Sequence, residues 1–265
     1  MEIAADEVMV SFDVISLFTA IPVDKACIYI KEKLEQDSTL SHRTHLEIDE
    51  LSFVLSNNYF VFEGQTYKQI HGCAMGSPVS PVVANICMEK IEEMAIKTVP
   101  VPPRTWKRFV DDSFSIVKKN AVETFHNTLN SLDPSIQFTL EQEHNGKLAF
   151  LDTVITRKDE KLVIDVYRKP THTDRYLDYN SHHQHKHKAS TARTLIHRAL
   201  TLPNTEEGRN NELEYVKNAL RTNNYPQRTI NNIITQSRST LSFDPSPEEL
   251  AAMFFKMVEP PIQQS

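Results

Sequence analysis

The sequence predicts an α+β fold, in which an antiparallel sheet of the split β-α-β type is backed by helices and followed by a small helical unit. Short runs rich in β-branched residues alternate with amphipathic stretches, hairpin signals recur, and the pattern becomes helical after Pro170. With 265 residues, 40% of them hydrophobic, the chain is long enough to bury the core of one large or two small domains.

The first half of the chain is expected to alternate strands, helices and hairpins. Val8–Val14 is a buried strand candidate that ends at an acidic residue, and Pro22 opens a helix in which apolar residues recur at helical spacing. The further elements expected here are a helix at Ile48–Ser56, a hairpin at Tyr59–Ile70, a turn with Gly72, Gly76 and Pro78, a helix at Val79–Met94 and a hairpin at Arg108–Val117.

The second half begins with strands and ends with helices. After an amphipathic helix at Val122–Leu132, the pattern predicts strands at Ile136–Glu141, Lys147–Thr156 and Lys161–Tyr167. Helices are expected at Thr191–Leu202, Glu206–Arg221 and Gln227–Ser237, and a loosely packed tail with one short helix at Glu248–Met257. The expected domains are residues 1–157, 158–240 and a tail at 241–265.

Charge is unevenly distributed along the chain. The formal net charge is -6, yet residues 1–150 carry -8 and residues 151–240 carry +5. The basic block suits a polyanionic partner, and an acidic block suits the binding of divalent cations, so the global charge excludes neither.

No window approaches 18 apolar residues and the first residues are acidic, so we expect neither a membrane span nor an export signal. Cys27, Cys73 and Cys87 form no CxxC pair, which favours buried thiols in a reducing compartment.

Three aspartates are the candidates for chemistry. Asp13 ends the first predicted strand, and Asp111 with Asp112 occupies the tip of a predicted hairpin beside it. Converging carboxylates repel one another unless a cation lies between them, and two Mg²⁺ ions about 3.5–4 Å apart support in-line phosphoryl displacement. Taken alone, the doublet is more often an ordinary acidic turn, although the lack of glycine there weakens that alternative.

Four segments resemble, in order, motifs A, B, C and the D/E region of reverse transcriptases: SFDVISLFTAIPV (Ser11–Val23), HGCAMGSPVSPVVANICME (His71–Glu89), RFVDDSFSI (Arg108–Ile116) and KLAFLDTVITR (Lys147–Arg157). The closest resemblance is to the reverse transcriptases of Penelope-like retroelements. YRKPTHTDRYLDYNSHH (Tyr167–His183) and the helices after it resemble that family's thumb or helix-turn-helix-like segment. The motifs are specific as a set, cover about residues 8–237, and imply a polymerase palm followed by this helical region.

The resemblance implies an RNA-directed DNA polymerase that extends a DNA primer on an RNA template with deoxynucleoside triphosphates. Asp13 and Asp111 would bind two Mg²⁺ ions, with Mn²⁺ as an alternative. Asp112 would be the second member of the motif C pair and a weaker metal ligand, and the carbonyl of Val14 would assist. The family also implies an intracellular, nuclear protein.

The same motifs imply contacts to the incoming nucleotide. Phe18 stands where the family has the steric gate that excludes a ribose 2′-hydroxyl by volume, although an ordinary core phenylalanine is the alternative. Gly76 would let the backbone approach the nucleotide, and Ser77 and Pro78 would start the helix that supports it. Asn85 would be a polar contact near the nucleotide. The chain has AMG where many reverse transcriptases have PQG, so no side-chain amide is available there.

The D/E region and the basic block supply the remaining candidates. Leu148, Phe150 and Leu151 match the region that supports the primer end, or are ordinary core strand residues, and Lys147 would be a proton donor to pyrophosphate. A histidine run fits no zinc spacing well and is interpreted as a solvated loop that touches phosphate together with Lys186, Lys188, Arg193 and Arg198; the run consists of His182, His183, His185 and His187.

Two segments expected of such an element are not recognised in the sequence: the basic fingers region before motif A and a GIY-YIG endonuclease after the helices. We therefore expect a truncated copy that is feeble or inactive in isolation, because neutralising the triphosphate stabilises the transition state of phosphoryl transfer. A catalytically dead nucleic-acid-binding module that retains the palm fold is the main alternative. A metal-dependent nuclease is a third, for which motif B would have no purpose.

Overall fold

The computed structural model describes residues 3–37, 39, 44–158 and 161–240. The chain divides into two compact units: Asp6–Gln142, called the N-terminal unit, and Glu143–Ser265 with Met1–Ala5, called the C-terminal unit. The tail at 241–265, with the short helix expected at Glu248–Met257, lies outside the described residues.

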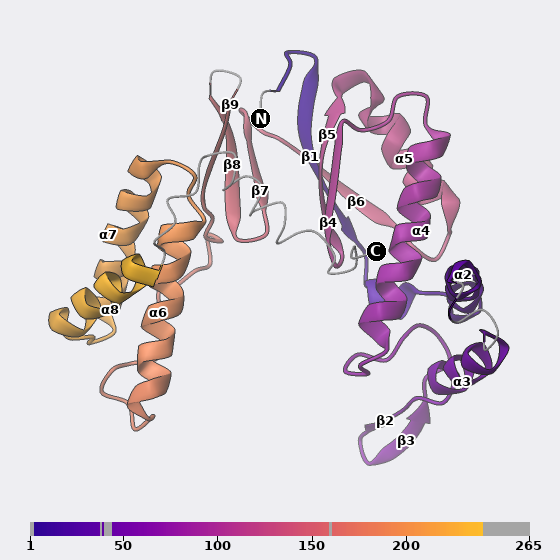
Figure 1. Ribbon diagram of the computed structural model, residues 1–265, viewed down its shortest axis with the longest axis horizontal. Helices are drawn as coiled ribbons and strands as arrows, with labels where there is room; N and C mark the ends of the chain where they lie inside the picture. Colours follow the sequence, from indigo (N-terminus) through magenta and orange to yellow (C-terminus); the bar gives the residue numbers. More distant parts are fainter. Residues whose placement is uncertain (1–2, 38, 40–43, 159–160, 241–265) are drawn as a thin grey trace. The chain divides into compact units, whose positions relative to one another are not determined.

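A four-stranded antiparallel sheet with the strand order β4-β5-β1-β6 organises the N-terminal unit (Figure 1). The bounds of its strands are β1 Glu7–Val14, β4 Thr105–Phe109, β5 Asp112–Lys118 and β6 Phe138–Gln142. β1 is central, because it pairs with β5 on one side and with β6 on the other. The predicted antiparallel sheet is therefore confirmed, and the first strand of the chain lies in its middle.

Helices cover one face of this sheet (Figure 1). Val8, Val10, Phe12 and Val14 of β1 share a buried core with residues of α4 (Ser80–Thr98) and α5 (Val122–Leu132). Because side chains alternate along a strand, the odd-numbered residues of β1 lie on the opposite face of the sheet. The remaining elements of the unit are α1 Leu17–Ala20, α2 Val23–Gln36, α3 Thr44–Ser56, η2 Lys119–Ala121 and the hairpin β2 Tyr59–Phe62 with β3 Gln65–Lys68.

The fourth helix is longer than the sequence pattern indicates. The prediction ended it at Met94, whereas α4 continues for another turn to Thr98, and Ala95 is buried in the core. Val99 is then extended, with a ψ of 140°, because the ring of the following Pro100 disfavours the helical conformation at the residue before it. The proline therefore sets the end of the helix. The polar residues of the last turn remain helical.

In its described residues, the C-terminal unit combines a three-stranded antiparallel sheet with three helices (Figure 1). Its strands, in the order β7-β8-β9, are β7 Lys147–Phe150, β8 Thr153–Lys158 and β9 Lys161–Val166. The segment Lys147–Thr156 was predicted as one strand and is a hairpin, because Leu151 adopts a left-handed φ of 52° that reverses the chain. The helices are α6 His185–Thr201, α7 Glu206–Thr222 and α8 Gln227–Thr240.

The three helices enclose a second apolar core. Its buried members come from all three helices and from the turn before α8, and include Ile196, Leu220, Tyr225 and Ile230. The predicted helical unit is therefore confirmed. Asn204, in the turn between α6 and α7, connects the three helices to the three-stranded sheet. Its amide accepts a hydrogen bond from Ile164 N (2.9 Å) and donates one to Leu162 O (2.9 Å) of β9. In the part of the chain that the structure describes, no helix has both the length and the apolar character needed to cross a membrane.

A close backbone approach at Gly72 gives a first testable prediction. A Cβ on Gly72 would lie 2.5 Å from Thr19 Cα, whereas a Cβ on Gly64, which has a similar positive φ, would meet open space. Gly64→Ala should lower the free energy of unfolding by about 1–2 kcal/mol through backbone strain alone. Gly72→Ala should lose roughly 1–3 kcal/mol more, because the clash adds overpacking.

Urea unfolding followed by the fluorescence of Trp106, the only tryptophan of the chain, measures both variants in the N-terminal unit. Equal losses for the two variants would show that the segment at Gly72 does not lie against Thr19.

Candidate functional site

Asp13 lies on the face of the four-stranded sheet opposite to the helix-covered face. It is exposed, whereas its neighbours Phe12 and Val14 are buried in the core on the helix-covered face. In the antiparallel register Asp13 is directly opposite Asp112 of β5 and, on its other side, opposite Thr139 of β6. Residues directly opposite one another point to the same face, so Asp13 and Asp112 share it.

The second acidic position is a two-residue turn. Phe109 pairs with Asp112, which leaves Val110 and Asp111 as the loop of the β4–β5 hairpin. Val110 has a φ of 58°, a conformation that a β-branched residue rarely adopts, and strain of this kind is concentrated at functional sites. The carbonyl of Asp111 accepts a hydrogen bond from Val14 N (3.2 Å), so the turn is fixed to the end of β1.

The negative charge of Asp111 acts on the carboxyl group of Asp13. Partial burial raises the pKa of Asp13 above its ordinary value, and the negative charge of Asp111 raises it further. Among the described residues, no group of three or more His, Cys, Asp or Glu side chains is arranged to hold a metal ion. A pair of carboxylates nevertheless fits Mg²⁺, which is commonly bound by one or two carboxylates while waters and substrate phosphates complete its shell. The assignment of metal ligands stays a prediction.

A buried arginine, Arg108, connects the acidic turn to helix α4. The side chains of Arg108 and its ion-pair partner Glu92 are only 7% and 12% exposed. Arg108 also donates to Asn85 Oδ1 (2.9 Å) and to the carbonyl of Val110 (3.1 Å). Burial raises the pKa of Glu92 in spite of the arginine, and removing one partner of such a pair typically costs about 3–5 kcal/mol. Arg108 therefore connects α4 to the strained residue of the turn.

Sequence reasoning missed this role of Arg108. A basic residue among the apolar and aromatic residues of a strand, three positions before an Asp doublet, was the available signal. The same contacts affect the prediction for Asn85, whose amide also donates to Glu89 Oε1 (2.7 Å), so that both ends of the amide are engaged within the protein. A nucleotide contact by Asn85 stays a prediction.

The predicted nucleotide residues of motifs A and B belong to two connected segments. Phe18, half-buried in α1 against the core, accepts a hydrogen bond through its carbonyl from Cys73 N (2.6 Å). Gly76 has a φ of +93°, and nothing lies within 4 Å of the position a Cβ would take, so its backbone faces open space. Ser77 and Pro78 lie in the turn before α4, and the helix itself begins at Ser80.

The predicted phosphate contacts do not form one surface. The structure corrects the interpretation of the histidine run as a loop, because α6 begins at His185 and places His185 and His187 in its first turn. Lys186 and Arg193 are exposed and seven residues apart, so they share one face of α6. The other two predicted cations are engaged within the protein: Lys188 Nζ donates to Ser181 O (2.7 Å), and Arg198 pairs with Asp152 (3.1 Å).

The residues predicted to support a primer end lie in the C-terminal unit. Leu148 and Phe150 are buried in β7, whereas Lys147 at the start of the strand and Leu151 in the turn are exposed. Burial of this kind suits core residues of a strand, the alternative that the sequence left open. Their contact with a primer stays a prediction.

Solved structures of nucleic-acid polymerases share this fold. The telomerase of Candida albicans, in complex with a TWJ fragment of telomeric RNA, aligns with a TM-score of 0.57 and 14% identity over 97% of this chain and 47% of that chain. The RNA-dependent RNA polymerase of a human picobirnavirus aligns with a TM-score of 0.60 and 10% identity over 96% and 51%. The apo telomerase of Candida tropicalis aligns with a TM-score of 0.52 and 14% identity over 96% and 46%.

These similarities define a class: the chain has a reverse-transcriptase-like palm fold, as found in telomerases and viral RNA polymerases. It spans about half the length of the polymerase chains that it matches. The family described as the Animal helix-turn-helix domain matches residues 175–235, which contain α6, α7 and most of α8. No protein with curated annotation matches the chain.

The coupling of the two carboxylates can be measured directly. Asp111→Asn removes the negative charge that helps to raise the pKa of Asp13, so this pKa should fall toward, but not reach, its ordinary value, because partial burial still raises it. Titration of the Asp13 carboxyl carbon by NMR in the absence of divalent cations measures the change. Glu123→Gln on α5 is the control and should leave the pKa of Asp13 unchanged; an equal response to both substitutions would contradict the coupling.

Proposed function

We propose that the chain is the palm and following helical region of a reverse transcriptase of the Penelope-like type, which extends a DNA primer on an RNA template with deoxynucleoside triphosphates. The observation that carries the proposal is the position of two acidic residues at one end of a polymerase-like sheet. Asp13 lies on the central strand, and the Val110–Asp111 turn is hydrogen-bonded to the end of that strand. The order of motifs A, B and C along the chain supports the same reading.

Asp13 and Asp111 would hold two divalent cations, Mg²⁺ or Mn²⁺, with help from Asp112 and the carbonyl of Val14. Bound ions of this kind orient the attacking hydroxyl and stabilise the leaving oxygen of the displacement. The pKa of Asp13, which partial burial raises and the charge of Asp111 raises further, supports this assignment, because a bound cation would stabilise the charged form of this carboxylate. The protein's own contribution is to hold one carboxylate on a paired strand and the other in a turn that is hydrogen-bonded to the end of that strand, before any substrate arrives.

The residues around Gly76 would receive the nucleotide. The open space above Gly76 leaves its backbone free for close approach, and Ser77 and Pro78 hold the turn that leads into α4. Phe18 would exclude a ribose 2′-hydroxyl by volume, because its ring packs against the core and cannot move aside without loss of packing.

The C-terminal unit would hold the strands of the nucleic acid. Lys186 and Arg193 offer two exposed cations on one face of α6, which suits contacts to phosphates that position a strand without reading its sequence. The telomerase with a similar fold was solved with RNA, which supports an RNA partner for this chain.

Metal binding and primer extension test the central residues. Asp13→Asn and Asp111→Asn should each weaken Mn²⁺ binding, followed by electron paramagnetic resonance, by about tenfold or more, since each removes a charged ligand. Extension of a DNA primer on an RNA template should fall by roughly a hundredfold or more. Asp112→Asn should have a smaller effect, and Glu123→Gln none.

Three outcomes separate the alternatives. Extension that is unaffected by Asp111→Asn would reject the assignment of the site. Salt-dependent binding of nucleic acid without incorporation of nucleotides would favour a catalytically inactive binding module. Degradation of labelled strands without added nucleotides would favour a metal-dependent nuclease.

Phe18 allows an independent test of the nucleotide pocket. Phe18→Ala opens space beside the sugar, so the use of ribonucleotides relative to deoxynucleotides should rise by about tenfold or more. Competition assays with matched nucleotide pairs give this ratio. Phe53→Ala is the control, because Phe53 is 70% exposed on α3. A ratio that is unchanged by Phe18→Ala would make Phe18 an ordinary core residue.

A further inference from the structure

A cavity of about 400 Å³ lies in the C-terminal unit, and none of the residues assigned above to catalysis lines it. It is bounded by the β7–β8 turn, the segment that follows β9, and the facing sides of α6 and α7. This volume is within the range of sites for small ligands. Apolar residues, tyrosines and threonines line it together with three basic side chains, Arg168, Lys169 and Arg198, and with His172, Asp152 and Glu212.

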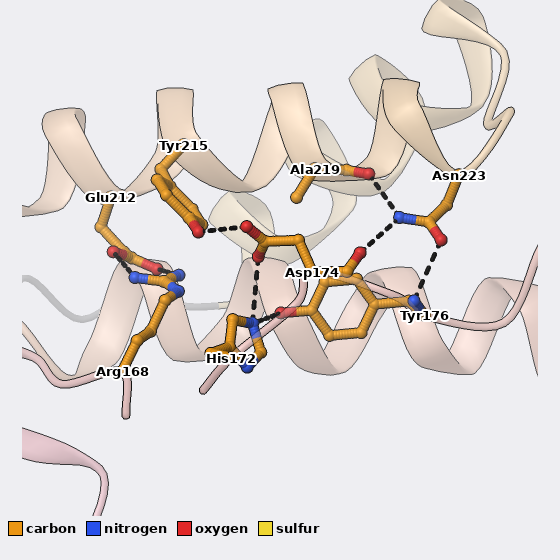
Figure 2. Close-up of polar contacts among 8 residues, drawn as sticks. All are labelled: Arg168, His172, Asp174, Tyr176, Glu212, Tyr215, Ala219 and Asn223. Atoms are coloured by element: carbon orange, nitrogen blue, oxygen red, sulfur yellow. Dashed lines mark hydrogen bonds and ion pairs between the residues drawn. The ribbon is translucent and has the colours of Figure 1, made fainter. Parts of the chain in front are cut away.

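One wall of the cavity is held rigidly by contacts to α7 (Figure 2). The guanidinium of Arg168 makes a bidentate ion pair with Glu212 and lies 3.8 Å from the centre of the Tyr215 ring. Asp174 accepts a hydrogen bond from the hydroxyl of Tyr215 and contacts the ring of His172. The segment from Arg168 to Asp174 is thus tied to the helix, so the cavity is formed in advance of any ligand.

A buried asparagine holds the backbone of this segment in place (Figure 2). Asn223, 8% exposed, accepts a hydrogen bond from Tyr176 N (3.0 Å) and donates to the carbonyls of Asp174 (2.8 Å) and Ala219 (2.8 Å). Tyr176 therefore keeps a fixed backbone position at the cavity, and its ring lies beside His172. An aromatic side chain held in this way can stack on a planar ligand at little entropic cost.

The three basic side chains differ in how completely they are neutralised. Arg168 and Glu212 are 21% and 11% exposed and fully engaged with each other. Arg198 instead has a single contact of 3.1 Å to Asp152, whose side chain is 68% exposed, and such surface pairs contribute little. Lys169 is exposed at the same cavity. An incoming anion could therefore take the place of Asp152 on Arg198 and gain Lys169 as well.

The turn that presents Asp152 is strained. Leu151, which lines the cavity, has a φ of 52°, which is rare for a bulky residue, and Asp174, which directly follows the lining residue Thr173, has a φ of 54°. Left-handed residues other than glycine persist where the surroundings enforce them, and they cluster at ligand sites. Strain in one lining residue and in the direct neighbour of another agrees with a binding role for the cavity.

We propose that this cavity binds a nucleotide, with its phosphate between Arg198 and Lys169 in place of the Asp152 carboxylate and its base against Tyr176. Cations beside an aromatic side chain suit a phosphate joined to a planar ring, whether as a free nucleotide or as one unit of a single strand. The site goes beyond the proposed polymerase reaction, because it shares no residue with the Asp13–Asp111 pair.

Calorimetric titration of the full chain tests the proposal. The ligands are a deoxynucleoside 5′-monophosphate, a 5′-phosphorylated single-stranded hexanucleotide and, as the control, the nucleoside without phosphate. EDTA is present throughout, so that failure of the metal site and failure of the cavity are distinguishable. The monophosphate should bind about tenfold more tightly than the nucleoside. A hexanucleotide that binds more tightly still assigns the site to a strand, whereas binding of the monophosphate alone assigns it to a free nucleotide.

Variants of the ion pair make the test specific. Arg198→Ala should weaken binding of the monophosphate by about tenfold, whereas Asp152→Asn should tighten it several-fold, because the competing carboxylate is lost. Asp152 is mostly exposed, so this variant should keep the fold, which circular dichroism checks. Arg238→Ala on α8, away from the cavity, is the control for loss of an arginine. No binding of the monophosphate at millimolar concentration, or affinity that Asp152→Asn leaves unchanged or lowers, would overturn the proposal.

Discussion

The antiparallel register between β1 and β5 is the constraint on which the candidate site depends. It places Asp13 directly opposite Asp112 and brings the Val110–Asp111 turn to the end of the central strand. A shift of one residue would turn Asp13 toward the helix-covered core and bury an unpaired carboxylate. The alternation that buries Val8, Val10 and Phe12 against the helices therefore also places the aspartate on the opposite face, so that folding and function require the same register.

The protein maintains an electrostatically unfavourable site on a well-supported backbone. The repulsion between Asp13 and Asp111 and the positive φ of Val110 both cost stability, and the buried Arg108–Glu92 pair with its contact to the Val110 carbonyl holds the turn in place. Because the pKa of Asp13 is raised in the folded chain, its ionisation disfavours folding as the pH rises through that pKa. A bound cation would reverse the sign of this contribution. The arrangement is one in which stability is exchanged for a site that can bind charge.

The sequence predicted the elements better than their ends and their contacts. Alternation and helical periodicity are local properties, so β1, α5 and the antiparallel sheet could be predicted from the residues alone. The hairpin at Lys147–Lys158 could not, because it depends on a left-handed leucine for which the sequence offers no glycine as a signal. The start of α6 at His185 was missed because a histidine and lysine cluster is compatible with both a loop and the exposed first turn of a helix.

The candidate sites show the same difference: local patterns could be predicted from the sequence, and contacts between distant segments could not. The aspartates were recognisable because motif order places them on neighbouring strands, whereas the role of Arg108 depends on the contact between α4 and β4. Four cations in the basic block looked equivalent in the sequence, yet two are exposed on one face of α6 and two have partners inside the C-terminal unit. The cavity beside Arg198 has no sequence signature, since its walls come from strands and helices that are far apart along the chain.

The most direct test of the central claim is a crystal structure of the chain grown with Mn²⁺ and recorded at a wavelength where manganese scatters anomalously. If Asp13 and Asp111 share a cation, an anomalous peak should lie within coordination distance of both carboxylates. Carboxylates that point away from each other, with manganese bound elsewhere or not at all, would contradict it.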